Sequence, residues 1–476
     1  MAVISCGFVV FLAFSVASCC YTCTDPNAPG FSSRITQIGV QSFREYGIKK
    51  LTEMVYSLEI PPQSGKSITV SYKAWNLKVT NFEVPTSKVI LQDDIGVKVM
   101  LSNISISITG KFWYRAFVTK HSGDLNINIK GMSTAFTFGI GETGGRPSLF
   151  CYDYLCDLDA GDVAVHLTPG PASHEAEAEA YLKDTLNKKG CSEIVKKING
   201  DVDENLSKLS MRYPIHQVLD FDFSFVSPPV INNQSLDIQH KGEVYLIDNH
   251  DEASLPKQTL PKDADMSRMF FAWVTDFVAN SASYVLFQYD YLQYDITEKD
   301  VPTGSKLSLN TSAYPTNVWI PNVTQMFPGK VLEVGLKSTA PPTVTSTTSG
   351  VTVTASGNVT VYINNPSKPL QYLFTLSSQL TMLYKLGVNR GNVTWVANLV
   401  SINVNLIQTA IGPFKIDTLK KMLPKDFQTY IIPMINQRGA IGVTIPCSDD
   451  IKVVNTVIQH ASGYLKFGTD FATNIK

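Results

Sequence analysis

The sequence has few cysteines and almost no net charge. Eight cysteines among 476 residues, of which 44% are apolar, exclude the small disulfide-dense scaffolds that fold without a large core. A formal charge of −1 argues against a general binder of polyanions. The length predicts two or three domains of about 150 residues, each large enough to bury a core of its own.

Signatures of catalysis are also missing. The chain has no Gly-x-Ser-x-Gly, no His-Glu-x-x-His and no P-loop. No histidine lies at ligand spacing from the cysteines, which argues against a zinc site. The histidines are scattered, and four of them fit turns or the surface better than the role of a base: His121, His166, His174 and His250. We therefore expect neither an enzyme nor a metal site.

Long apolar runs are missing except at the N-terminus. "MAVISCGFVVFLAFSVASCC" contains an apolar run of about a dozen residues followed by the small residues Val16-Ala17-Ser18, the pattern of a signal peptide. No later stretch approaches the roughly 20 apolar residues that span a bilayer. The sequence therefore predicts a signal peptide over residues 1–18 and a secreted, extracellular protein. The predicted N-glycosylation sites are Asn103, Asn205, Asn233, Asn310, Asn322, Asn358 and Asn392.

Charge is distributed unevenly along the chain. Residues 31–130 carry 13 Lys and Arg against 7 Asp and Glu, whereas residues 131–210 carry 7 against 13. The basic region contains "TGKFWYRAFVTKHSG" (109–123), in which cations alternate with large aromatic residues. Such a stretch fits a nucleic-acid surface, a contact with a membrane surface, or an exposed strand with a mixed face. Secretion argues against nucleic acid as a partner.

Hydrophobic periodicity divides the chain into two halves of similar order. A helical spacing over residues 34–58 is followed by period-two strands over 66–168. A second helix is predicted over 175–209, interrupted around Gly190 and Gly200, and strands return over 213–245. A polar segment without periodicity, residues 248–267, is the predicted linker.

The second half repeats this order. Residues 270–290 predict a helix, strands follow, and residues 414–439 predict a helix broken at Pro424 and Pro433 before the terminal strands. A duplicated α+β architecture is therefore expected. An apolar helix against a twisted sheet encloses an elongated apolar interior, which holds a ligand such as an acyl chain if the side chains do not fill it.

Five segments in collinear order carry a family resemblance: "APGFSSRITQIGVQSFREYGIKKL" (28–51), "ISISITGKFWYRAFVTKHSGDLNINIKGMS" (104–133), "HKGEVYLIDNH" (240–250), "IGPFKIDTLKKML" (411–423) and "YLKFGTDF" (464–471). Together they resemble the bactericidal/permeability-increasing protein and lipopolysaccharide-binding protein family. The resemblance implies two similar domains, each a highly twisted antiparallel β-barrel with long helices, joined in a boomerang by a central β-sheet. It places the domains at 19–247 and 268–476, and pairs Cys156 with Cys191 in a disulfide.

The resemblance also implies two kinds of lipid site. Basic and aromatic residues at the tip of the N-terminal domain would contact anionic lipid: Lys66, Lys73, Lys78, Lys111, Trp113, Arg115 and Lys120. An apolar pocket would be lined from two helices by Ile35, Ile38, Phe43, Ile48, Leu51, Tyr181, Leu182 and Ile194, all expected to face inward.

The function that the resemblance implies is that of a secreted innate-immunity protein. It would bind the lipid A part of lipopolysaccharide on the outer-membrane surface of Gram-negative bacteria and act as a monomer. It would hold phospholipid acyl chains in apolar pockets and need no other cofactor. A bactericidal, permeability-increasing action stays open. Two alternatives stay open: a phospholipid transfer protein, and a secreted structural or coat protein of the same fold. Family members specialised for neutral-lipid transfer carry a helix beyond the closing strand. The short ending "FATNIK" (471–476) therefore favours recognition of lipopolysaccharide over lipid transfer. The lipid species, the partner of Cys447 and the fate of Cys19, Cys20 and Cys23 stay open.

Overall fold

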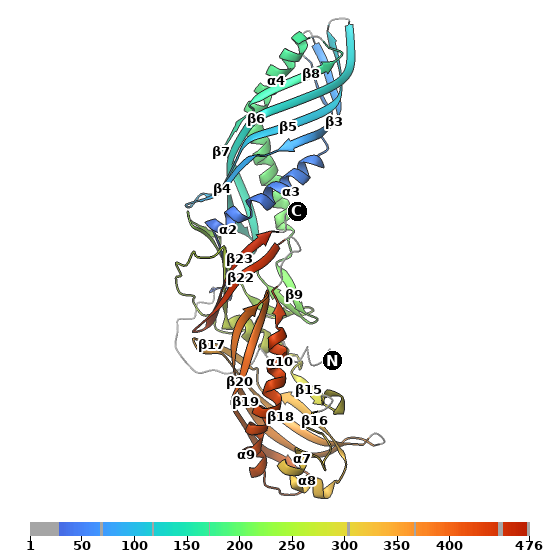
Figure 1. Ribbon diagram of the computed structural model, residues 1–476, viewed down its shortest axis with the longest axis vertical. Helices are drawn as coiled ribbons and strands as arrows, with labels where there is room; N and C mark the ends of the chain where they lie inside the picture. The colour runs from blue at the N-terminus through green and yellow to red at the C-terminus, as the bar shows by residue number, and fades with distance from the viewer. Residues whose placement is uncertain are drawn as a thin grey trace.

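A computed structural model describes residues 28–66, 70–116, 119–170, 172–301, 305–365, 368–445 and 451–473. The predicted signal peptide (1–18) and the cysteines Cys19, Cys20, Cys23 and Cys447 lie outside these residues. The molecule is elongated, with one half of the chain at each end and a central sheet between them (Figure 1). This is the two-domain α+β arrangement that the family resemblance implied.

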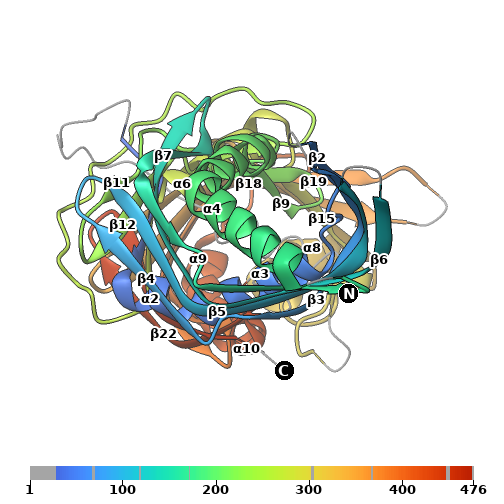
Figure 2. The same cartoon turned by 90° about the horizontal axis from the view of Figure 1, so that it is seen from above.

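The N-terminal domain is built on a seven-stranded antiparallel sheet. Its strands are β2 (Gln63–Lys66), β3 (Val70–Glu83), β4 (Thr86–Gln92), β5 (Gly96–Ala116), β6 (Thr119–Thr143), β7 (Arg146–Asp159) and β8 (Asp162–Thr168). The order is β2-β3-β5-β6-β7, with β4 paired to β5 and β8 paired to β6. The sheet curls into a half-barrel around α4 (Ala172–Lys197) (Figure 2). The period-two pattern over residues 66–168 thus predicted the strands correctly.

The first helix begins later than its periodicity indicated. Residues Phe31–Thr36 form strand β1, and the helix follows in two parts, α2 (Gln37–Ser42) and α3 (Arg44–Tyr56). Thr36 caps α2, since its side chain accepts a hydrogen bond from the Gly39 amide at 3.3 Å. The spacing of Ile35 from the next apolar residues fits a strand and a helix equally well. The sequence therefore predicts a helix that begins too early.

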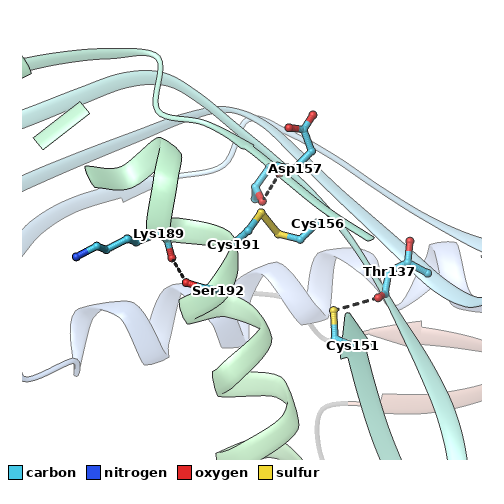
Figure 3. The surroundings of a disulfide bond; sticks show 8 residues. Thr137, Cys151, Cys156, Asp157, Lys189, Cys191 and Ser192 are labelled. Carbon is cyan, nitrogen blue, oxygen red and sulfur yellow. Dashed lines mark hydrogen bonds between the residues drawn. A yellow bond between two sulfur atoms is a disulfide. The ribbon is translucent and has the colours of Figure 1, made fainter. Parts of the chain in front are cut away.

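The second helix is continuous through Gly190, contrary to the prediction. It runs as α4 to Lys197, passes through a π-helical turn (Ile198–Val202) that contains Gly200, and ends as α5 (Asp203–Ser207). A disulfide between Cys156 and Cys191 ties β7 to this helix, with 5.6 Å between the Cα atoms (Figure 3). Cys151 on the same strand is a free, buried thiol, and its Sγ donates to the Thr137 carbonyl oxygen at 3.1 Å.

The central sheet has six strands, three from each half of the chain. Its order is β11 (Val230–Ile231), β12 (Ser235–His240), β1, β14 (Phe270–Thr275), β23 (Tyr464–Thr473) and β22 (Ile451–Ala461). Strands β1 and β14 are antiparallel neighbours, with Phe31 opposite Val274. Each ends in a threonine before a helix: Thr36 donates to the Arg268 carbonyl at 2.8 Å, and Thr275 to the Gly30 carbonyl at 2.7 Å. The two halves therefore meet through reciprocal contacts.

The C-terminal domain repeats the half-barrel. Its strands are β15 (Gln293–Ile296), β16 (Val331–Ser338), β17 (Thr343–Thr347), β18 (Gly350–Asn364), β19 (Gln371–Asn389), β20 (Asn392–Thr409) and β21 (Val443–Thr444). The helices are α6 (Asp276–Gln288), α7 (Thr316–Trp319), α8 (Pro321–Met326), α9 (Asp417–Asp426) and α10 (Ile432–Ile441), with a short turn of 3-10 helix at Glu298–Asp300. A small sheet of β9 (Arg212–His216), β10 (Leu219–Asp222) and β13 (Glu243–Leu246) adjoins α6.

Two helix predictions in this half need correction. The segment 270–290 begins as strand β14 and turns helical only at Asp276, as β1 and α2 do in the first half. The helix over 414–439 is not broken at its prolines, because Pro424 lies inside α9 and Pro433 at the start of α10. A π-helical turn (Phe427–Ile431) lies between them and carries the chain from one helix into the next.

The polar segment 248–267 contains no helix or strand, yet its end is firmly held. Lys466 of β23 has a side chain only 8% exposed and contacts the carboxylates of Asp263 at 2.7 Å and Asp265 at 2.8 Å. The Arg34 guanidinium on β1 donates to the Asp263 carbonyl oxygen at 2.7 Å and pairs with Asp237 at 2.6 Å. The segment is thereby clamped across strands from both halves. The exact domain boundaries at residues 247 and 268 stay a prediction.

Replacing Lys466 by Met should destabilise the protein strongly. The substitution leaves Asp263 and Asp265 without their cation at a largely buried position, so we expect the free energy of unfolding to fall by about 2–4 kcal/mol. The matched control is Lys452→Met on the neighbouring strand β22, where the side chain is exposed and the expected change is within about 0.5 kcal/mol. Denaturant titration measures both changes. Equal losses of unfolding free energy in the two variants would contradict a stabilising contact of Lys466 with Asp263 and Asp265.

Stability should also fall as the pH is lowered, because of His240. Its Nδ1 lies 2.7 Å from the Phe223 carbonyl, which can only accept, so Nε2 accepts from the Ser33 hydroxyl at 2.9 Å. Burial lowers the pKa of His240 below its usual 6.5. The unfolded chain therefore takes up the proton first, and stability is complete above about pH 6.5 and is lost as the pH falls.

The measurement is the free energy of unfolding at about pH 7.5 and about pH 5.5. His240→Gln should make this difference smaller than in the wild type, whereas His166→Gln, at an exposed position on β8, should leave it unchanged. Burial also lowers the pKa of His460, so some pH dependence should persist in His240→Gln. An unaltered pH dependence in that variant would rule out the buried neutral histidine.

Candidate lipid-binding site

The residues predicted for the tip lie on β2, β3, β5 and β6, near the far end of the N-terminal half-barrel. Strand β5 lies between β3 and β6, with Trp113 opposite Lys73 on one side and Ser122 on the other. Arg115 lies opposite Ser71 and Lys120 in the same way. Because directly paired residues project from the same face of a sheet, these side chains form one surface.

The other predicted cations extend this surface. Lys66 on β2 lies opposite Ser71 of β3, which in turn lies opposite Arg115 of β5. Lys78 lies opposite Thr109, farther from the end of the strands. Lys111 is on the same face but forms an ion pair with Asp124. We call the set Lys66, Lys73, Lys78, Lys111, Trp113, Arg115 and Lys120 the basic tip. All its cationic side chains are exposed, so it presents positive charge to solvent.

The aromatic residues of this stretch separate onto two faces. Trp113 is outward and half-buried, and the Lys120 ammonium lies 5.2 Å from the centre of its ring. Phe112 and Tyr114 are buried on the opposite face, in a cluster that Leu182 of α4 packs against. The strand's alternation therefore removes two aromatics from the surface and leaves a tryptophan among cations.

A cavity of about 370 Å³ lies beneath α2 and α3, between these helices and the sheet. One side consists of Ile35 at the end of β1 and of Val40, Phe43, Arg44, Gly47, Ile48 and Leu51 along the helices. The sheet side consists of Ser87, Val89, Val99, Leu101 and Phe136. Only Arg44 and Ser87 among them carry polar side chains. The volume is within the range of about 300–1,000 Å³ typical of small-molecule sites, and the lining suits an apolar chain.

Polar side chains hold the helices over this cavity. Gln37 donates to the Val89 carbonyl at 2.9 Å and accepts from the Leu91 amide at 2.8 Å. Gln41 accepts from the Val89 amide at 3.3 Å, and Arg44 donates to the Ser87 carbonyl at 3.2 Å. Strand β4 pairs only with β5, so these contacts satisfy its free edge. The helices are therefore attached along one side and arch over the sheet.

Helix α3 leaves space beneath it. None of its residues is fully buried, although Ile48, Leu51 and Val55 pack against buried residues of β3 and β5. Gly47 is the fourth residue of the helix, and glycine inside a helix costs about 1 kcal/mol relative to alanine. A Cβ added there would meet nothing within 4 Å. Gly47 is itself exposed, so it lies at the open edge of the cavity that it helps to line.

The structure places the predicted pocket residues in three groups. Ile35, Phe43, Ile48 and Leu51 line the cavity, whereas Leu182 and Ile194 are half-buried on α4 away from it. The expectation that Ile38 and Tyr181 face inward was wrong, because their side chains are 56% and 60% exposed. In α2 the side that faces the protein carries Gly39 and Val40, so Ile38 points outward. Contact of any of these residues with lipid stays a prediction.

Sequence reasoning missed the whole sheet side of the cavity and three helical residues, Val40, Arg44 and Gly47. A helical spacing does connect Val40, Phe43, Gly47, Ile48 and Leu51, and could have indicated a single stripe. The strand residues Val89, Val99 and Leu101 carry no signal of their own, since any inward strand position is apolar. Only the register of β4 and β5 beneath the helix brings them together.

Other predicted features have the following placement. The sequons at Asn103, Asn205, Asn233 and Asn322 are exposed, whereas those at Asn310, Asn358 and Asn392 are half-buried, and their glycosylation stays a prediction. Within the described residues no group of histidine, cysteine and carboxylate side chains could hold a metal ion. None of the helices in that part of the chain is both long and apolar enough to cross a membrane.

Comparison with protein families identifies the class. The N-terminal domain of the LBP / BPI / CETP family matches residues 39–209, and its C-terminal domain matches residues 214–473. Together these matches span most of the chain, so the protein belongs to the LBP / BPI / CETP family.

Individual relatives extend over nearly the full length. A bactericidal permeability-increasing protein of Sebastes schlegelii is 25% identical over 454 residues, covering 93% of this chain and 95% of the relative. A lipopolysaccharide-binding protein of Mus musculus is 25% identical over 454 residues and covers 93% of each chain. A phospholipid transfer protein of Mus musculus is 21% identical, covering 93% of this chain and 90% of the relative.

A solved structure agrees with this assignment at the level of the fold. The crystal structure of a lipopolysaccharide-binding protein matches 94% of this chain and 99% of its own, with a TM-score of 0.55 at 22% identity. The relatives are named for binding lipopolysaccharide or transferring phospholipid. This agrees with the expectation of a family of lipid-handling proteins.

Two neighbouring glycines should respond oppositely to alanine. Gly47→Ala should raise the free energy of unfolding by about 0.5–1 kcal/mol, because α3 gains helix propensity and the new methyl group enters open space. Gly39→Ala in α2 should lower it, because the Cβ would collide with the Met269 carbonyl oxygen. Thermal and denaturant unfolding measure both changes. A loss of stability in Gly47→Ala would mean that the space under α3 is filled.

Proposed function

We propose that the protein is a secreted, monomeric lipid-binding protein that recognises lipid A of lipopolysaccharide on Gram-negative bacterial surfaces. The observation that carries this proposal is the basic tip, in which Lys66, Lys73, Arg115 and Lys120 surround Trp113 on one exposed face. Lipid A presents phosphates beside acyl chains. Such a surface attracts cations electrostatically and accommodates tryptophan at the boundary between polar and apolar regions.

The geometry of the tip supports a membrane-surface contact in particular. Cationic side chains on one exposed face of the sheet can meet several phosphates at once, and each contributes about 1 kcal/mol near an anionic surface. The buried side of the same strands packs against α4, so the face is supported from beneath. Lys111 contributes less than its neighbours, because Asp124 already neutralises it.

The cavity beneath α2 and α3 supports a second part of the proposal, the binding of an acyl chain of phospholipid. Its walls are apolar apart from Arg44 and Ser87, and each methylene buried there contributes about 0.8 kcal/mol. The same cavity favours phospholipid transfer as the alternative function. Exchange of labelled phospholipid between vesicles, without preference for lipid A, would favour that alternative.

The triple variant Lys73→Gln/Arg115→Gln/Lys120→Gln tests recognition by the tip. Loss of three cations should weaken binding to vesicles that contain lipid A by about 3 kcal/mol, or about 100-fold. The measurement is vesicle co-sedimentation at low and at high salt, and the salt dependence should be less steep in the variant. Binding to uncharged vesicles should be unaffected.

The matched control carries Lys88→Gln and Lys130→Gln, which remove exposed cations on β4 and β6 outside the basic tip. It should bind lipid A vesicles as the wild type does. If the triple variant also binds normally, recognition by the tip is wrong. If the two variants lose affinity in proportion to the three and the two charges removed, overall charge and not the tip governs binding.

A further inference from the structure

Arg44 is the single charged residue in the lining of the cavity beneath α2 and α3. It is the first residue of α3, one helical turn before Gly47, so it lies beside the open space that the glycine leaves. A guanidinium in an otherwise apolar wall is costly unless its donors are satisfied. Its contacts are therefore informative about what the cavity receives.

The hydrogen bonds of Arg44 use only some of the N–H donors of its guanidinium group. One Nη1 hydrogen is donated to the Ser87 carbonyl at 3.2 Å, and Nη2 donates to the Glu45 carboxylate at 3.0 Å. The Nε atom is buried and has no hydrogen-bond partner among the described residues. Since a guanidinium carries five N–H donors in a rigid plane, an unmet donor remains where water is excluded.

The contact with Glu45 is not a strong competitor for this group. The Glu45 side chain is 66% exposed, and the Arg44 side chain is 30% exposed, so the pair lies at the surface. Exposed ion pairs contribute little to stability. The Ser87 contact, by contrast, fixes the guanidinium against β4 at the rim of the cavity. Arg44 is thus positioned by one backbone contact, it shares its charge with an exposed carboxylate, and its Nε–H has no partner among the described residues.

We propose that Arg44 binds the anionic head of a lipid whose acyl chain occupies the cavity, and so makes this site selective for anionic over uncharged lipids. The inference rests on the proposed function of the cavity as an acyl-chain site. The planar guanidinium pairs with two oxygens of a carboxylate or a phosphate, and Nε supplies one of the donors. A fatty acid and a phospholipid would both present this chemistry.

Three lipids with the same chain distinguish the sources of the anion: palmitate, palmitoyl lysophosphatidate and monopalmitoylglycerol. Titration calorimetry below the micellar concentration of each lipid measures their affinities for the full-length protein. The wild type should bind one or both anionic lipids at least about tenfold tighter than the neutral one, as expected for a hydrogen-bonded charge pair. Preference for palmitate identifies a carboxylate, and preference for lysophosphatidate identifies a phosphate.

The variant Arg44→Met keeps an unbranched apolar stem and removes the donors. Its affinity for the anionic lipids should fall about tenfold, whereas its affinity for monopalmitoylglycerol should equal that of the wild type. Arg44→Lys can still donate to the Ser87 carbonyl and keeps the charge, so it should retain an intermediate preference. Lys49→Met removes a cation from the same helix outside the cavity lining and should leave all three affinities unchanged.

The results separate this inference from the function on which it rests. Equal affinities for the three lipids in the wild type, or an unchanged preference in Arg44→Met, would overturn the role of Arg44 and leave the acyl-chain site standing. If Arg44→Met lowers the affinity for all three lipids equally, Arg44 only attaches the helix to β4, and the inference is again wrong. Absence of binding for all three lipids would overturn the acyl-chain site itself, and with it the proposed function on which this inference rests.

Discussion

Strands β1 and β14 lie side by side at the middle of the central sheet, and each leads directly into a helix of its own half. Their antiparallel pairing and the reciprocal bonds of Thr36 and Thr275 determine where the two helices begin. Lys466 then fastens the segment that connects the halves, through Asp263 and Asp265. The position of α2 and α3 over the N-terminal half-barrel, and hence the cavity beneath them, follows from this junction.

The helices over the cavity are held differently from an ordinary core helix. Gln37, Gln41 and Arg44 follow one helical stripe and bond the free edge of β4, whereas the apolar side of α3 stays incompletely packed. Attachment through an edge allows a helix to arch over a sheet without filling the space below. The lost packing would be recovered when an acyl chain enters, at about 0.8 kcal/mol for each methylene buried. Stability and ligand binding would therefore be coupled in this part of the protein.

Local patterns in the sequence predicted the strands, the helices and the duplication, because period and turn residues depend on short segments. They failed where tertiary contacts decide. Ile35 belongs to a strand because β12 and β14 flank it, and Gly190 stays helical because α4 packs against β7 and β8. At the basic tip the alternation of Lys111, Trp113 and Arg115 already indicated one face. The neutralising partner Asp124 and the roles of Arg44 and Gly47 depend on register between distant segments, which no local pattern contains.

The central claim is that the space beneath α3 receives an acyl chain. The most direct measurement is a crystal structure of the protein soaked with a fatty acid that carries bromine near the end of its chain, with anomalous diffraction to locate the bromine. We expect an anomalous peak inside the cavity, between Gly47 and Leu101. A cavity that contains only water, with the bromine elsewhere or absent, would contradict it.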